Sequence, residues 1–172
     1  IRPRDWSSDG CSSDLTPDAV RAAVNPVPRT DAVLTEALEH FADHCAACHA
    51  NDGSGNTPMG RSFYPPVPDM RGPETQGRTD GELFSIIENG VRLTGMPAWG
   101  TGSAADQQSS WALVHFIRHL PTLTPDEVDK MASLNPRSPD AFRQEEEARR
   151  FLAGEDVAPA ATPAPEAHHG AH

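Results

Sequence analysis

The stretch Cys45-Ala46-Ala47-Cys48-His49 decides how this sequence is interpreted. Two residues separate the cysteines, which places the two thiols about one turn apart on a helix. Three chemistries use such a pair: thioether attachment of a c-type haem, a redox disulfide, and half of a zinc site. In haem attachment, the thiols add to the two porphyrin vinyl groups and the histidine that follows becomes an axial iron ligand.

The rest of the chain distinguishes between these three chemistries. A thioredoxin-like pair lies at a helix start inside a βαβ pattern, and this sequence has no strand pattern. A structural zinc site needs a second ligand pair at comparable spacing, and none exists. A disulfide framework would show more than three cysteines, at wider spacings. Haem attachment is therefore the favoured interpretation.

A second motif, Gly95-Met96-Pro97-Ala98-Trp99-Gly100, lies in a loop that we expect between two helices. A methionine thioether is a soft iron ligand that favours the reduced state. Pro97 fixes the backbone beside Met96, and the glycines allow a close approach to a flat ring. The alternative is that Met96 fills a gap in the core, as methionine usually does. We favour Met96 as the second axial ligand over Met59 and Met70, which lie in the proline-rich loop nearer to His49.

Apolar residues at helical spacing predict three core helices around these motifs. The first begins at Asp31, which we expect as its N-cap, and runs into the cysteine motif. The second is capped by Asp80 and ends at Gly90. The third extends from about Ala105 to Leu120. A loop rich in glycine and proline over residues 50–79 has a length typical of a segment that wraps a cofactor.

These motifs and helices, taken in order, resemble a class I bacterial c-type cytochrome over residues 33–120. The resemblance implies an all-α fold, with helices and long Gly/Pro loops wrapped around one covalently bound haem c. It implies that Cys45 and Cys48 hold the haem and that His49 and Met96 are the iron ligands. In one respect the chain departs from mitochondrial-type members, because the lysine face that they use to dock partners is missing.

The resemblance also implies finer contacts. Phe41 is expected to pack against the region of Trp111. A carbonyl of one proline is expected to accept a hydrogen bond from the His49 ring. The candidates for that carbonyl are Pro58, Pro65 and Pro66, and the candidates for hydrogen bonds to the haem propionates are Tyr64, Arg92 and Trp99.

Charge limits the partners of the chain. The formal net charge is −11, and residues 33–120 carry ten acidic and five basic groups. Lys130 is the single lysine. Nucleic acid is excluded as a partner because phosphate binding needs a basic face. No apolar run of about eighteen residues exists that could span a bilayer. We expect redox proteins as partners, with any membrane association made through an N-terminal anchor.

The chain divides into five segments by composition. Residues 5–15 resemble a translated sequencing adapter, so we treat residues 1–15, including Cys11, as non-native and expect the native start to encode a signal peptide or anchor. Residues 16–32 are expected to form a linker, and residues 33–120 the cytochrome domain. Residues 121–154 are expected to form a helical extension, and residues 155–172 a disordered tail rich in Ala, Pro and His.

Other histidines could in principle bind a metal. His40/His44 and His115/His119 have the i, i+4 spacing of a helical metal site, but a solvated helix face is the favoured interpretation. Three histidines lie in the tail, where a segment without a metal function is favoured. They are His168, His169 and His172.

The function that the sequence favours is electron transfer rather than catalysis. Two axial protein ligands leave no open iron position for a substrate, so we do not expect an enzyme. The expected location is the periplasm or another extracytoplasmic compartment. The alternative is that the chain is the electron-transfer subunit of a larger respiratory or periplasmic oxidoreductase.

Overall fold

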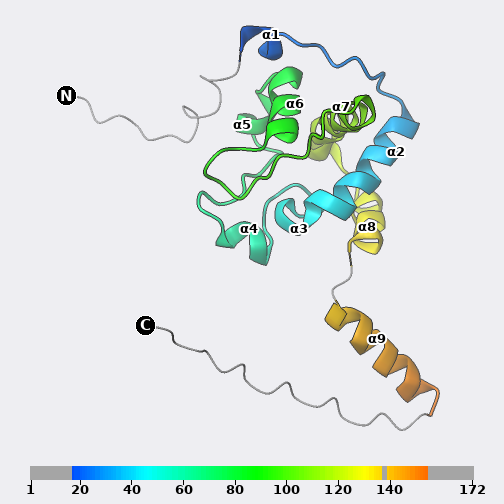
Figure 1. The fold of residues 1–172 in the computed structure, drawn as a ribbon. Coiled ribbons are helices and arrows are strands. Elements are labelled where there is room, and N and C mark those ends of the chain that lie inside the picture. The colour runs from blue at the N-terminus through cyan, green and yellow to red at the C-terminus, as the bar shows by residue number, and fades with distance from the viewer. Residues whose placement is uncertain (1–16, 137–138, 155–172) are drawn as a thin grey trace, which may run out of the picture. The chain divides into compact units, whose positions relative to one another are not determined.

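The computed structural model of the chain describes residues 17–136 and 139–154, which belong to two separate compact units. Helices connected by loops form the described part of the chain, and no strand occurs there (Figure 1). The predicted all-α fold is therefore confirmed. The first unit ends at Pro136 and contains α1 (Asp18–Arg21), α2 (Asp31–His40), the π-helix η2 (Phe41–Cys45), α3 (Ala46–His49), α4 (Pro58–Ser62), α5 (Pro73–Gln76), α6 (Asp80–Asn89), α7 (Ala104–His119), the 3₁₀-helix η3 (Leu120–Thr122) and α8 (Pro125–Leu134).

Threonines, rather than the aspartates that we expected, cap α2 and α6. Thr30 and Thr79 have extended backbone angles, and the side chain of each accepts a hydrogen bond from the helix that follows. Asp31 and Asp80 are the first helical residues, where a carboxylate favours the helix dipole. At α6 the capping box is complete, because Glu82 bonds back to the backbone N–H of Thr79.

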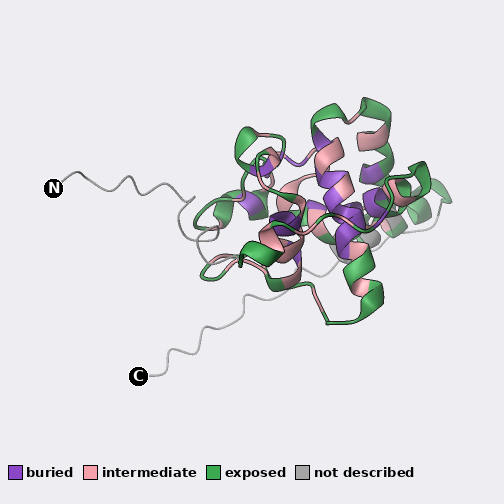
Figure 2. Ribbon diagram, turned by 90° about the horizontal axis from the view of Figure 1, so that it is seen from above, coloured by how far each residue is buried: buried purple, intermediate pink, exposed green. Residues whose placement is uncertain are grey.

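The core lies where α2 crosses α7 (Figure 1). Phe41, at the end of α2, packs on Phe116 of α7 with ring centroids 5.0 Å apart. Trp111, which we expected near Phe41, stacks on Phe84 of α6 at 4.1 Å. Phe41 therefore packs on the helix of Trp111, as expected, but its aromatic partner there is Phe116, five residues further along. Figure 2 shows the buried residues gathered on the inward faces of the packed helices.

Replacing Phe116 with alanine should lower the free energy of unfolding by about 3–5 kcal/mol, because Phe116 is fully buried and its loss leaves a cavity. Chemical denaturation of the holoprotein measures this change. A matched control is Phe151→Ala in α9, where the side chain is 75% exposed and the expected change is within about 0.5 kcal/mol. Equal effects at the two positions would contradict this packing.

The segment before α2, which we expected to be part of a linker, contacts α7. The side-chain amide of Asn25 donates a hydrogen bond to the carbonyl of Trp111 at 2.8 Å. Val27 is buried in the core, and its carbonyl lies 2.7 Å from Nε2 of His115. Residues 25–27 therefore pack on the surface of α7.

The predicted loop over residues 50–79 contains two short helices, α4 and α5, each of which has a proline in its first turn. A proline fits there because the first helical N–H groups have no partner within the helix.

After α7, helix α8 packs against α2 and η2 and buries Met131 completely. We expected residues 121–154 to form an extension, and the structure includes α8 in the first compact unit.

Helix α9 (Pro139–Leu152) belongs to the second unit. Its described side chains are mostly exposed, and they include Phe151 and Leu152 at its end. None of the helices in the described part of the chain combines the length and apolar composition that crossing a membrane requires. The predicted non-native segment and the predicted tail lie outside the described residues.

Candidate functional site

The two cysteines of the site lie where the π-helix η2 meets α3. Cys45 ends η2 and Cys48 lies in α3, and both are free thiols. Burial, with the neighbouring Cys48, raises the pKa of Cys45 to about 12, and burial also raises the pKa of Cys48. A redox-active C-x-x-C pair needs a lowered thiol pKa, so the environment of this pair differs from that of a thioredoxin-like site.

His49, the last residue of α3, has the properties of a metal ligand. Burial lowers its pKa to about 4, so the imidazole is neutral at pH 7. Its Nδ1 atom is buried and forms no hydrogen bond, an arrangement that costs about 1–3 kcal/mol in the absence of a partner. A neutral imidazole is the form that binds a metal, so the residues present fit the iron of a haem.

The predicted hydrogen bond from His49 to a proline carbonyl is not formed, since Nδ1 has no partner. The loop is attached to the cysteine segment at another point. The Thr57 hydroxyl donates to the carbonyl of Cys48 at 3.1 Å. Gly60 lies so close that a Cβ atom there would be 2.5 Å from the same oxygen. The start of α4 is therefore held against α3. The candidates for the hydrogen bond to His49, which is not formed, were Pro58, Pro65 and Pro66.

The three candidate methionines that lie between His49 and α7 have different environments. Met70 is 7% exposed and belongs to the hydrophobic core. Met59 is 50% exposed, and its sulfur lies 3.3 Å from the sulfur of Cys48. Met96 is half-buried in the loop between α6 and α7. Met70 therefore has the packing role usual for a core methionine.

The loop that carries Met96 folds back on the end of α6. Gly90 ends the helix with φ of 66°, and the carbonyl of Met96 accepts a hydrogen bond from Val91 at 3.1 Å. Further along, the N–H of Trp99 donates to the carbonyl of Ile87 at 3.0 Å. The backbone after Met96 is therefore fixed to α6, and Met96 itself is bonded to Val91 within the loop.

Two side-chain contacts connect this loop to the rest of the site. A Cβ atom at Gly95 would lie 2.5 Å from the ring of Phe63, so the two loops meet with no space between them. The ring of Trp99 lies 5.8 Å from that of His44 in η2. Phe63 was not predicted from the sequence, because it belongs to no recognisable motif, and His44 was considered only as half of a helical histidine pair. The structure thus brings the Met96 loop against segments on both sides of the cysteine motif.

The candidates for propionate binding lie in exposed positions. Tyr64 is 91% exposed and Trp99 is 40% exposed, and Arg92 is also exposed. Leu93, next to Arg92, is 98% exposed. The role of Tyr64, Arg92 and Trp99 in binding the haem propionates stays a prediction.

His44 is exposed, as we expected of a solvated helix face, whereas His40, His115 and His119 are half-buried. His115 lies within hydrogen-bond distance of the Val27 carbonyl, and His119 Nε2 lies 2.8 Å from a carboxylate oxygen of Glu127. The rings of His40 and His44 pack edge to face at 5.0 Å. In the described part of the chain, no three His, Cys, Asp or Glu side chains are grouped so that they could hold a metal ion. The tail histidines lie outside that part.

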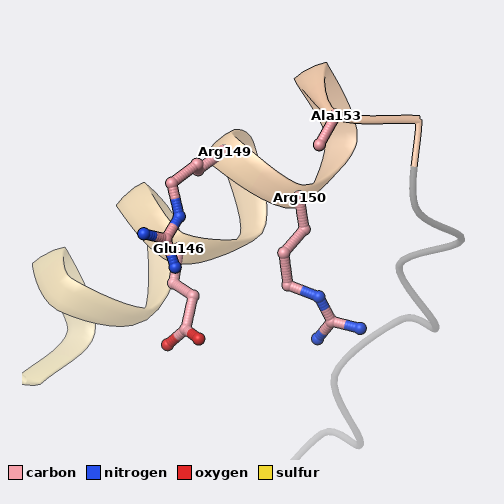
Figure 3. A pocket seen from close by; sticks show the side chains of 4 residues that line it. All are labelled: Glu146, Arg149, Arg150 and Ala153. Carbon is pink, nitrogen blue, oxygen red and sulfur yellow. The ribbon is translucent and has the colours of Figure 1, made fainter.

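A pocket on the surface of α9 is shown in Figure 3. Its lining side chains come from this one helix, and none of them belongs to the predicted haem site. This pocket therefore carries no part of the candidate site. The lining residues are Glu146, Arg149, Arg150 and Ala153.

The helical fold and the C-x-x-C-H segment, with its neutral, half-buried histidine, define a c-type cytochrome, a class that binds haem and transfers electrons. The sequence model of the family described as Cytochrome C oxidase, cbb3-type, subunit III matches residues 32–117. The match covers half of the chain and includes all four predicted site residues, so the chain belongs to this family. Cytochrome c domains are typically extracytoplasmic.

Proposed function

We propose that this protein carries electrons through one covalently attached haem c with His49 and Met96 as the two axial ligands. The observation that supports the proposal most directly is the environment of His49. Its imidazole is neutral and has a buried, unpartnered Nδ1 atom, one residue after a free cysteine. This combination suits a histidine that ligates a metal, and it lies in the family's matched region.

Each site residue has a separate task in this proposal. Cys45 and Cys48 would hold the porphyrin through thioethers, so that the cofactor is retained through every redox cycle. His49 and Met96 would ligate the iron, and the soft thioether of Met96 favours the reduced state. The bound haem supplies a one-electron couple. The close contacts around Met96 limit rearrangement of the ligand loop between the two redox states.

Two protein ligands would leave no open iron position, which favours a carrier over an enzyme. A second candidate function follows from the family's description, which names a subunit of an oxidase. In that case the chain would be the electron-transfer subunit of a larger respiratory complex. Affinity purification from the native membrane distinguishes the two, because a subunit copurifies with oxidase activity and a free carrier does not.

The visible spectrum of protein expressed with a haem-attachment system tests the proposed function. A single c-type haem should remain on the denatured polypeptide, and the reduced and oxidised spectra should both be those of a six-coordinate iron. One haem per chain is measured by iron content and mass. Protein that folds fully and never acquires haem would overturn the proposal.

We expect a basic redox partner to associate faster than an acidic one. Some cations of the first unit are paired with carboxylates, among them Lys130 with Glu39 at 3.1 Å and Arg71 with Asp52 at 2.8 Å. The remaining negative charge should steer a basic partner and raise its association rate by about tenfold or more at low salt. Stopped-flow electron transfer at increasing ionic strength measures the effect. Faster association with an acidic partner, with a steep loss on adding salt, would refute it.

We also propose that the protein matures and works outside the cytoplasm. The support is the c-type haem motif and the family match, since cytochrome c domains are typically extracytoplasmic. When the complete gene is expressed in its host, haem-stained polypeptide should occur in the periplasmic or membrane fraction. Haem-stained protein confined to the cytoplasmic fraction would contradict the proposal.

A further inference from the structure

The helix that leads into the cysteine motif changes its hydrogen-bond pattern at Phe41. In η2 the N–H of Ala46 bonds to the carbonyl of Phe41, five residues back, whereas an α-helix bonds four residues back. Each residue of an α-helix turns the chain by about 100°, so a change in this register redirects every side chain that follows. Short π-helices of this kind are often found at functional sites. Here, the register of η2 determines where Cys48 and His49 point.

Asn135, at the end of α8, contacts this segment both before and after the cysteine motif. With its amide nitrogen facing the acceptors, it donates to the carbonyl of Ala42 at 3.1 Å and to that of Met131 at 3.0 Å. It also forms a double amide contact with Asn51, at 2.8 and 3.0 Å. Ala42 lies within η2, and Asn51 follows His49 by two residues. The side chain of Asn135 therefore contacts the chain both before and after the haem-attachment motif.

Helix α8 holds Asn135 in a fixed place on the first unit. Met131, one turn before Asn135, is fully buried. The capping box of Thr124 and Glu127 fixes the start of α8, and Glu127 also bonds to His119 at the end of α7. These contacts lie after residue 117, where the family match ends. A segment outside the matched region thus supports the centre of the site.

We propose that Asn135 is a positioning residue for the haem-attachment segment. Its amide fixes the register of η2 at Ala42 and the exit of the chain at Asn51, and so fixes the direction of Cys48 and His49. This inference rests on the proposed function, because the segment has this task only if it holds haem. It adds a residue of α8 to the site without assigning it a contact with the cofactor.

The test compares holoproteins made with the same haem-attachment system. Asn135→Ala should shift the midpoint potential and the paramagnetic resonance spectrum of the oxidised protein, and should lower the yield of haem per polypeptide. Asn135→Asp should do the same, because a carboxylate keeps the shape but cannot donate to the two carbonyls. Asn51→Ala should cause a similar spectroscopic shift, and combining it with Asn135→Ala should add little.

Ser133→Ala is the matched control in the same helix, since the Ser133 hydroxyl bonds only within α8, to the carbonyl of Lys130. Its potential and resonance spectrum should equal those of the wild type. If Asn135→Ala lowers only the midpoint temperature of thermal unfolding, and leaves the midpoint potential and the resonance spectrum unchanged, the role of Asn135 is structural and the inference is wrong. If the wild type itself acquires no haem, the proposed function fails, which is a separate result.

Discussion

Met96→Ala should lower the midpoint potential of the haem and allow the reduced protein to bind carbon monoxide. Loss of the thioether removes a ligand that favours the reduced state and leaves one axial position open. Redox titration measures the first effect, and the absorbance change on adding carbon monoxide measures the second. The wild type, with both positions filled, should bind carbon monoxide weakly or not at all.

Two other methionines provide the controls for this assignment. Met70→Ala should remove core packing and lower the free energy of unfolding by about 2–5 kcal/mol, while the spectrum stays nearly unchanged. Met59→Ala should also leave the ligation unchanged, although its sulfur lies beside Cys48. If Met70→Ala alone opens the iron, or if Met96→Ala leaves the potential and carbon monoxide binding as in the wild type, the assignment of Met96 is wrong.

The surroundings of Met96 support its proposed role as an iron ligand. Met96 is bonded to Val91 within its loop, the chain after it is bonded to α6 through Trp99, and Gly95 lies tightly against Phe63. Trp99 reaches His44 in the π-helix that ends at Cys45. The Met96 loop thus contacts the residue that precedes the cysteine motif, although Met96 and His49 lie 47 positions apart in the chain.

Local sequence signals predicted the helices well, because each signal acts within one or two turns. The core stripes of α2, α6 and α7 follow the helical period, and Gly90 ends α6 as expected. The caps were misplaced by one residue, because Thr-Asp occurs at both starts and either side chain can cap a helix. The prolines at positions 58 and 73 were a usable signal for α4 and α5, since proline favours the first helical turn.

The parts that could not be predicted depend on contacts between distant segments. The π-helix has no local signature, and its support by Asn135 joins residues that lie more than 80 positions apart. The pairing of Phe41 with Phe116 depends on the rotation of α7, which the sequence stripe leaves open because Trp111 is also apolar. The four predicted site residues came from short motifs, and their roles as haem ligands stay predictions.

Replacing both Cys45 and Cys48 with alanine should abolish covalent haem attachment entirely. The two thioethers are the proposed covalent links, so denatured double variant should show no haem peroxidase stain on a gel and no haem mass on the polypeptide. Each single variant keeps one thiol and should retain part of the stain. Cys11→Ala is the matched control, since Cys11 lies outside the motif and its loss should leave the full stain.

The loss of haem stain in the double variant should be complete because thioether bonds are covalent. Iron ligands can exchange, and denaturation releases a haem that is held by ligation alone, whereas a thioether survives on the unfolded chain. The covalent haem should therefore remain on the unfolded chain. It should stabilise the fold only when α2 is packed on α7. A double variant that folds normally and keeps the stain would place the attachment outside the cysteine motif, and a stain lost in Cys11→Ala alone would place it at Cys11.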